Sequence, residues 1–211
     1  MRYIGDVHGK YRRYKRIIRS APASIQVGDL GVGFYKLQGP RVGEITGNPP
    51  HYLMVRHNAE FIRGNHDNPH VCKNHSQCIP DGHYRPETKT MFIGGMFSID
   101  RAQRKKDWTW WEDEELSYKE LKDMIERYQN LRPEVMVTHG CPASVAREVL
   151  RPRMTSMYST YDASRTEMAL EQMWQAHSPK LWIFGHHHTP FDHVLNGTRF
   201  ICLAELEYID I

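Results

Sequence analysis

The chain has 211 residues, of which 40% are hydrophobic and 25% are charged, and its formal net charge at pH 7 is +3. This composition is that of an ordinary globular protein, so we expect residues 1–211 to form a single domain and exclude a disordered or fibrous chain. No stretch approaches the roughly 18 consecutive apolar residues of a membrane span, and the first residues turn polar too early for a signal peptide. We therefore expect a cytoplasmic protein with reduced cysteines and no membrane partner.

Two short strands are predicted at the start of the chain, and a carboxylate follows each of them. Residues 2–5 lead into Asp6 and His8. In an extended backbone these two side chains would point the same way, so that both could bind one ion. Residues 24–27 lead into Asp29, which lies near glycines. Recurring carboxylates at strand ends predict a site at the C-terminal edge of a sheet.

A basic amphipathic helix is predicted over residues 10–20, between these strands. Six of the ten residues at 10–19 are basic, and apolar residues recur among them at helical spacing. Two interpretations stay open. The helix could present a solvated charged face, or it could attract a phosphate-rich substrate.

The stretch from 32 to 58 is rich in glycine and proline and is predicted to be a long loop over the site. Loops of that length in a compact domain are usually functional or mobile. We therefore regard it as a candidate for substrate selection, with a purely structural insertion as the alternative.

A third strand at residues 60–62 delivers the sequence Gly-Asn-His-Asp at positions 64–67. A histidine with an acid beside it suits proton donation to a leaving group, and an asparagine offers a neutral oxygen to a hard cation. Further on, Cys72 and Cys78 are separated by five residues, which is off the usual spacing of a zinc clip. A structural zinc there is the less favoured alternative.

Strands and helices alternate through the second half of the chain. Sequences of the capping-box type at 117–120 and 164–167 predict two helices. Further strands are predicted at 90–93, 135–137, 181–184 and 199–203. Two of these strands end in histidine motifs, Thr-His-Gly at His139 and Gly-His-His-His at His186 and His188.

Together, the strand ends supply seven oxygen and nitrogen donors, namely Asp6, His8, Asp29, Asn65, His139, His186 and His188. This number is too large for one ion and fits two ions that share one carboxylate. Two such cations can hold a phosphate, lower the pKa of a water and stabilise an in-line displacement. The donor set accepts several transition metals.

The five motifs, in this order and at strand ends, resemble those of the calcineurin-like metallophosphoesterases, and the resemblance runs from residue 6 to residue 188. It implies an α/β (α+β) fold, a four-layer αββα sandwich with the dimetal site at the C-terminal edge of the strands. It also implies the ligand sets: Asp6, His8 and His188 for the first ion, Asn65, His139 and His186 for the second, and Asp29 as the bridge. His66 would protonate the leaving oxygen, and Asp67 would orient His66.

The resemblance implies a metal-dependent phosphoric ester hydrolase that acts by attack of a bridging hydroxide. Mn²⁺ is the favoured ion, while Fe, Zn, Co and Ni remain open because the donor set accepts them all. The substrate is then a phosphate ester, and a nucleotide or nucleic acid is among the candidates. The oligomeric state stays open.

The second motif departs from that of the protein phosphatases of this family, which continue it as Gly-Asp-x-x-Asp-Arg-Gly. Here the run after Asp29 lacks both the second aspartate and the arginine. This leaves Arg63 and Arg101 as candidate phosphate contacts, and it favours a nucleotide or other phosphodiester over a phosphomonoester. A serine/threonine-type protein phosphatase and a non-catalytic metal-binding interaction module are the alternatives.

Overall fold

The structure, a computed structural model, describes residues 1–34, 48–147 and 162–211. The loop predicted over 32–58 thus lies partly outside the described residues, and its role in substrate selection stays a prediction. The described part of that stretch contains a short helix, α2 (His51–Arg56), which the sequence analysis missed. Met54 of α2 is fully buried, whereas Tyr52 and Val55 are exposed, so the helix packs through one side only.

The first of two sheets carries the N-terminal motifs. Its order is β10-β1-β2-β3, and its strands are β10 (Tyr208–Asp210), β1 (Arg2–Ile4), β2 (Ser24–Gln26) and β3 (Ala59–Phe61). The pairs β1–β2 and β2–β3 are parallel, and β10 pairs antiparallel with β1. Every residue of β1 and β2 is buried, as is typical of parallel strands covered on both faces.

The second sheet has the order β4-β5-β6-β7-β9-β8. Its strands are β4 (Tyr84–Arg85), β5 (Thr90–Ile93), β6 (Val135–Thr138), β7 (Leu181–Phe184), β8 (Phe191–Leu195) and β9 (Thr198–Cys202). The four inner strands are parallel, and β4 and β8 pair antiparallel at the two edges. The inner strands agree with the predicted ones, whereas β4, β8 and β10 were not predicted.

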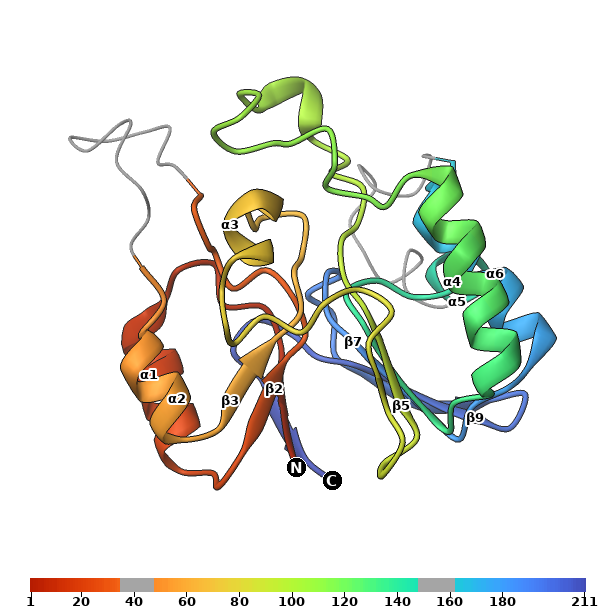
Figure 1. Ribbon diagram of the computed structural model, residues 1–211, viewed down its shortest axis with the longest axis horizontal. Helices are drawn as coiled ribbons and strands as arrows, with labels where there is room; N and C mark the ends of the chain where they lie inside the picture. Colours follow the sequence, from red (N-terminus) through yellow and green to blue (C-terminus); the bar gives the residue numbers. More distant parts are fainter. Residues whose placement is uncertain (35–47, 148–161) are drawn as a thin grey trace.

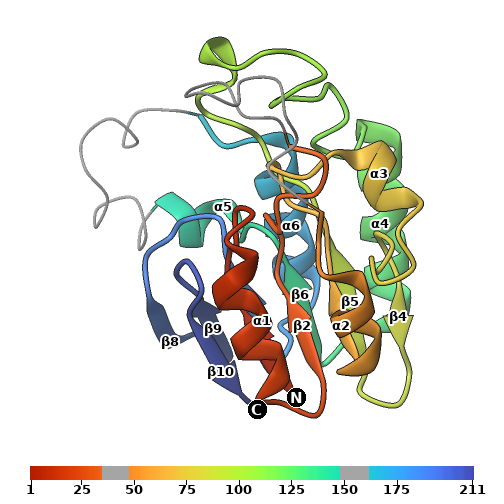
Figure 2. The ribbon, with the colours of Figure 1, turned by 90° about the vertical axis from the view of Figure 1, so that its left-hand side faces the viewer.

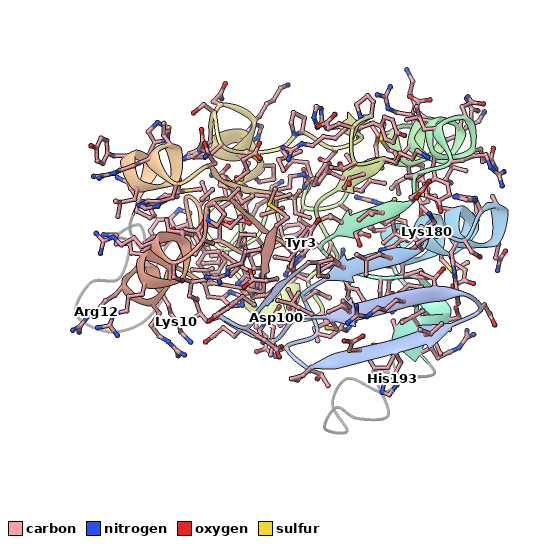
Figure 3. The ribbon with its side chains drawn as sticks, turned by 90° about the horizontal axis from the view of Figure 1, so that it is seen from below. Tyr3, Lys10, Arg12, Asp100, Lys180 and His193 are labelled. Atoms are coloured by element: carbon pink, nitrogen blue, oxygen red, sulfur yellow. The ribbon has the colours of Figure 1, made fainter. Side chains whose placement is uncertain are left out.

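The two sheets pack face to face around an apolar layer that includes Tyr3, Ile25, Phe92, Val137 and Ile183. Seen from below, Tyr3 lies between the sheets, while Lys10 and Arg12 lie on the outer side with the first helix (Figure 3). The inner apolar layer excludes water from the sheet faces and leaves the strand ends as the place where polar side chains from both sheets can meet.

Helices cover the outer face of each sheet. On one side, α1 (Tyr11–Arg19) and α2 lie in front of the first sheet, as Figure 2 shows. On the other, α4 (Tyr118–Leu131) and α6 (Arg165–Ala176) lie together against the second sheet (Figure 1). Both predicted capping boxes are formed at the starts of α4 and α6. The result is the predicted four-layer αββα sandwich.

Three short elements complete the described chain: α3 (Pro69–Lys73), a 3₁₀ turn η1 (Arg101–Gln103) and α5 (Ala143–Val145). Within the described ranges, no helix combines the length and the apolar character needed to cross a bilayer.

Candidate metal centre

All seven predicted ligands follow the C-terminal ends of parallel strands. They are Asp6 and His8 after β1, Asp29 after β2, Asn65 after β3, His139 after β6, and His186 and His188 after β7. The parallel strands of both sheets run to the same end of the molecule (Figure 1). The structure therefore brings ligands from both sheets together at one edge, as the sequence predicted.

Four of these residues form a first cluster. One ligand atom from each of Asp6, His8, Asp29 and His188 lies within 4.8 Å of the others. Nε2 of His188 lies 2.8 Å from Oδ2 of Asp6, and it lies 3.0 Å from Nε2 of His8. Ring nitrogens and carboxylate oxygens that converge in this way are the arrangement expected of ligands around a shared cation.

A second cluster surrounds the side-chain oxygen of Asn65. Oδ1 of Asn65 lies 3.0 Å from Nε2 of His139 and 3.0 Å from Nδ1 of His186. Nδ1 of His139 donates to the carbonyl oxygen of Val27 at 2.9 Å, which leaves Nε2 to face the cluster. A backbone partner of this kind fixes the tautomer and the ring orientation of a metal-binding histidine.

Asp29 lies between the two clusters. Its Oδ1 is 3.3 Å from Nε2 of His139, and its Oδ2 is 3.8 Å from Nε2 of His8. Oδ1 also accepts a hydrogen bond of 2.7 Å from the backbone N–H of His66. Each carboxylate oxygen thus faces a different cluster, which is the geometry that a bridging ligand requires.

Four of the predicted ligands have an unusual backbone conformation. The φ angles of His8, Asp29, His186 and His188 are 47°, 60°, 64° and 52°. Residues other than glycine seldom adopt this left-handed conformation, and such strain concentrates at functional sites. Four left-handed residues at one edge of the sheets therefore mark this edge as a candidate functional site.

Asp6 and His8 are brought together by a turn and not by the alternation of an extended strand. The strand β1 ends at Ile4, before either residue. The backbone N–H groups of Val7 and His8 both donate to the carbonyl oxygen of Asp29, at 2.9 and 2.8 Å. The prediction of a shared direction was right in outcome, but its physical reason was wrong.

Glycines next to the ligands allow the loops to approach one another. A Cβ atom on Gly64 would collide with the carboxylate and the backbone nitrogen of Asp29. A Cβ atom on Gly185 would likewise collide with the carboxylate of Asp6. These glycines therefore make room for the ligand contributed by another loop.

The two buried carboxylates and the imidazole of His139 hold each other in charged states. Burial favours a raised pKa for Asp29, but the charge of His139 and of the other imidazoles outweighs it and holds the pKa well below its usual value. The pKa of Asp6 is also lowered, because the imidazoles of His188 and His8, which lie close to its Oδ2, outweigh its burial. For His139, burial lowers the pKa, but Asp29 outweighs this and raises it to about 9. The carboxylates are therefore ionised at neutral pH.

The polar atoms of the site fit a pair of divalent cations. Oδ2 of Asp6 is buried without a hydrogen bond of good geometry, although His188 lies within ion-pair distance. A buried ionised oxygen is costly unless it is paired or coordinates a metal. Among the described residues, Cys72 and Cys78 belong to no group of three candidate ligands, so a structural zinc there gains no support.

His66 lies beside the first cluster, with its ring centroid 4.7 Å from that of His8. Phe34 stacks on its ring at 5.0 Å, and Nη2 of Arg104 contacts its Nε2. Burial lowers the pKa of His66 to about 4, with Arg104 adding to this effect and Asp29 opposing it. In the protein without metal or substrate, the imidazole is therefore neutral at pH 7.

Asp67 orients loops and not the imidazole of His66, which corrects the role predicted for it. Its fully buried carboxylate accepts four backbone hydrogen bonds of 2.7 to 3.2 Å, from Leu30, Gly31, Val32 and Gly64. These bonds join the loop after β2 to the loop after β3. Asp67 thereby fixes the position of Asp29 relative to Asn65.

Arg63, predicted to contact phosphate, has structural partners instead. Its Nε donates to Asp81 at 2.7 Å, and its Nη1 donates to the carbonyl oxygens of Asp113 and Glu114 at 3.0 and 2.8 Å. The side chain is buried. These partners are 18, 50 and 51 residues away in the chain, so sequence spacing could not reveal them.

Two other arginines follow β5. Arg101 is exposed and lies over the ring of Phe97 at 4.5 Å, so its predicted phosphate contact stays a prediction. Arg104, which contacts His66, was missed by the sequence analysis. Its position three residues after Arg101 in the same run was the only signal that could have suggested it.

A comparison with protein families matches residues 3–190 to the family described as calcineurin-like phosphoesterase. The chain belongs to the calcineurin-like phosphoesterase family. The match covers every motif that carried the resemblance in the sequence, so that prediction is confirmed. No curated protein matches this phosphoesterase at the level of sequence.

This chain resembles 38 solved chains, among them the following two. One is phosphopantetheinyl hydrolase (PptH) from Mycobacterium tuberculosis, with 14% identity and a TM-score of 0.50 over 97% of this chain and 89% of that chain. The other is GAP50, the anchor in the inner membrane complex of Plasmodium, with 12% identity and a TM-score of 0.47 over 97% and 71%. At such low identity, the likeness to the hydrolase bears on the fold alone.

Proposed function

We propose that this phosphoesterase hydrolyses phosphate esters with two divalent ions, for which Mn²⁺ is the favoured metal. The observation that carries the proposal is the position of Asp29, whose two oxygens face two separate clusters of ligands. Asp6, His8 and His188 would hold the first ion, and Asn65, His139 and His186 would hold the second. A pair of bound ions would hold the phosphate, activate a water and stabilise an in-line displacement.

His66 is the residue placed to protonate the leaving oxygen. In the free protein its Nε2 accepts from Arg104 and carries no proton. An anionic phosphate beside His66 would raise the pKa of the imidazole and compete for the guanidinium of Arg104. Substrate binding would thus both protonate His66 and give the phosphate a cationic partner. Arg104 could then supply the charge that the arginine of the protein-phosphatase motif supplies elsewhere in the family.

A nucleotide or other phosphodiester is the substrate class that we favour. The support is the charge of α1, in which Arg12, Arg13, Lys15, Arg16 and Arg19 form no ion pair within the described ranges. Lys10, just before the helix, pairs with Glu205 at 2.6 Å. The helix starts directly after the loop that carries His8. The phosphates of a substrate that extends beyond the metal centre could therefore reach α1.

The function is tested by titrating metal-free protein with Mn²⁺ and following bound metal and hydrolysis of bis-p-nitrophenyl phosphate together. We expect two ions per chain and turnover that rises with occupancy of the second. A panel of phosphomonoesters, cyclic nucleotides, oligonucleotides and phosphopeptides, run with Mn, Fe, Zn, Co and Ni, then identifies substrate and metal. Two bound ions without turnover of any substrate would favour the non-catalytic alternative.

Removing charge from α1 should weaken the binding of a polyanionic substrate. For Arg12→Gln/Arg16→Gln we expect a raised KM for a single-stranded oligonucleotide. Because each phosphate contact contributes roughly 0.7 to the slope of log affinity against log salt, the slope should fall by about 1.4. Hydrolysis of bis-p-nitrophenyl phosphate should not change.

The matched control is Lys119→Gln/Lys122→Gln on α4, which covers the other sheet. It removes the same charge at a distance from the first sheet and should leave the salt slope at the wild-type value. If the two double variants behave alike, the basic face of α1 is only solvated and does not bind substrate.

A further inference from the structure

The hydroxyl of Ser98 joins the second ligand cluster to a buried carboxylate. Ser98 lies in the loop after β5 and is 1% exposed. Its Oγ lies 3.0 Å from Nδ2 of Asn65 and 2.6 Å from Oε2 of Glu114. Its backbone N–H donates to Oε1 of Glu114 at 2.9 Å. Both oxygens of one glutamate are thus used to hold one serine.

The direction of every bond at this hydroxyl follows from counting hydrogens. A hydroxyl has one hydrogen and two lone pairs. Burial raises the pKa of Glu114, but the two hydrogen bonds from Ser98 and the charge of Arg104 oppose this shift. As a carboxylate, Glu114 can only accept, so it takes the hydrogen of Ser98. The two lone pairs then accept from Nδ2 of Asn65 and from Nη1 of Arg104, which lies 3.1 Å away. The one donor and the two acceptor positions of the hydroxyl are then all used.

This polarity fixes the amide of Asn65. With the hydrogen of Ser98 committed to Glu114, only the NH₂ group of the amide can face the serine, because two acceptors would repel each other. The amide oxygen must therefore face Nε2 of His139 and Nδ1 of His186, where it lies 3.0 Å from each. If the amide were reversed, it would present NH₂ to the cation position, and this group cannot bind a metal.

Glu114 is itself held by Arg63. The guanidinium of Arg63 binds the carbonyl oxygens of Asp113 and Glu114, and its Nε pairs with Asp81. Glu114 is 3% exposed, so an ionised carboxylate there is costly unless its hydrogen bonds are satisfied. The buried charge has a clear use in fixing the direction of the serine hydroxyl.

We propose that Ser98, oriented by Glu114, is the positioning residue that fixes the Asn65 amide as an oxygen ligand for the second metal ion. The inference rests on the proposed two-metal function. The same hydroxyl also holds Nη1 of Arg104, whose Nη2 contacts His66. One serine therefore connects a metal ligand to the residue beside the proton donor, and neither Ser98 nor Glu114 touches the substrate in this role.

The test is the affinity of metal-free protein for each of two Mn²⁺ ions, measured by calorimetry and checked by elemental analysis. Ser98→Ala frees the amide to rotate, and Glu114→Gln offers the hydroxyl an NH₂ group in place of one oxygen. Each variant should weaken one of the two ions by about 10- to 100-fold, the range typical of residues that orient metal ligands. The other ion should bind within about twofold of its wild-type affinity.

Glu115→Gln is the matched control. Glu115 is also buried and is adjacent in the chain, but its Oε1 accepts from the backbone and side chain of Thr166 at 3.1 and 2.9 Å. This variant should bind both ions as the wild type does. The thermal midpoint of each metal-free variant shows whether it is folded. If Ser98→Ala is not folded, the affinities of Glu114→Gln decide the test.

The outcomes separate this inference from the function on which it rests. If the wild type does not bind two ions, the proposed function itself fails. If the wild type binds two and both variants match it at both positions, Ser98 does not position the ligand and only the inference is wrong. Equal weakening of both ions, or a lowered midpoint with unchanged affinities, would also overturn it, because each marks a general structural role.

Discussion

Asp29→Asn should lose the first metal ion and lower kcat/KM by on the order of a thousandfold. The variant keeps Oδ1, which accepts from the backbone of His66 and faces His139. It replaces Oδ2, which faces His8, by an NH₂ group that cannot bind a cation. The second ion thus keeps its oxygen while the first loses one. Losing several kcal/mol of charge stabilisation in the transition state corresponds to about three powers of ten in rate.

Asparagine is the informative substitution because the backbone at this position is left-handed. The φ angle of Asp29 is 60°, and asparagine tolerates that conformation better than alanine does. The loop after β2 should therefore keep its shape. A loss of activity can then be assigned to the missing ligand atom and not to a displaced loop.

The measurement is Mn²⁺ stoichiometry together with kcat/KM for bis-p-nitrophenyl phosphate. Asp192→Asn, which removes an exposed carboxylate paired with Arg199 at 2.7 Å, is the control and should match the wild type in both. If Asp29→Asn still bound two ions with wild-type affinity, Asp29 would not be a bridge and the two-ion assignment would fail.

The sequence predicted which side chains meet at the candidate metal centre, because each of them follows a strand whose pattern can be recognised locally. Residues such as His139 and His186 follow continuous apolar runs, and parallel strands with a common direction bring such ends to one edge. The helices α4 and α6 were predictable for a similar reason, since their capping boxes are contained within four residues. Local patterns thus defined most of the sandwich.

The roles that the sequence missed depend on contacts between distant residues. Arg63 was a candidate phosphate contact because the second motif lacks its arginine, but Asp81 and two carbonyl groups hold the Arg63 side chain. Asp67 follows His66 in the chain, yet its carboxylate turns toward backbone amides of the loop after β2. The edge strand β8 has a mainly exposed pattern without clear alternation, so no period marked it.

His66→Gln should lower kcat by a factor that depends on the leaving group, and this dependence would identify His66 as the proton donor. Glutamine can fill the space beneath Phe34 but cannot transfer a proton. For a phosphodiester with an alkyl leaving group, kcat should fall by roughly 10²- to 10⁴-fold, the usual contribution of a general acid. For bis-p-nitrophenyl phosphate the loss should be less than about tenfold, because nitrophenolate leaves without being protonated and little general-acid assistance is lost.

Metal content distinguishes this effect from damage to the metal centre. His66 is not among the assigned ligands, so the variant should bind two Mn²⁺ ions as the wild type does. His70→Gln is the matched control, because the His70 side chain is 79% exposed on α3. It should leave both leaving groups unaffected. Equal losses with both leaving groups would mean that His66 binds or orients the phosphate and does not protonate the leaving oxygen.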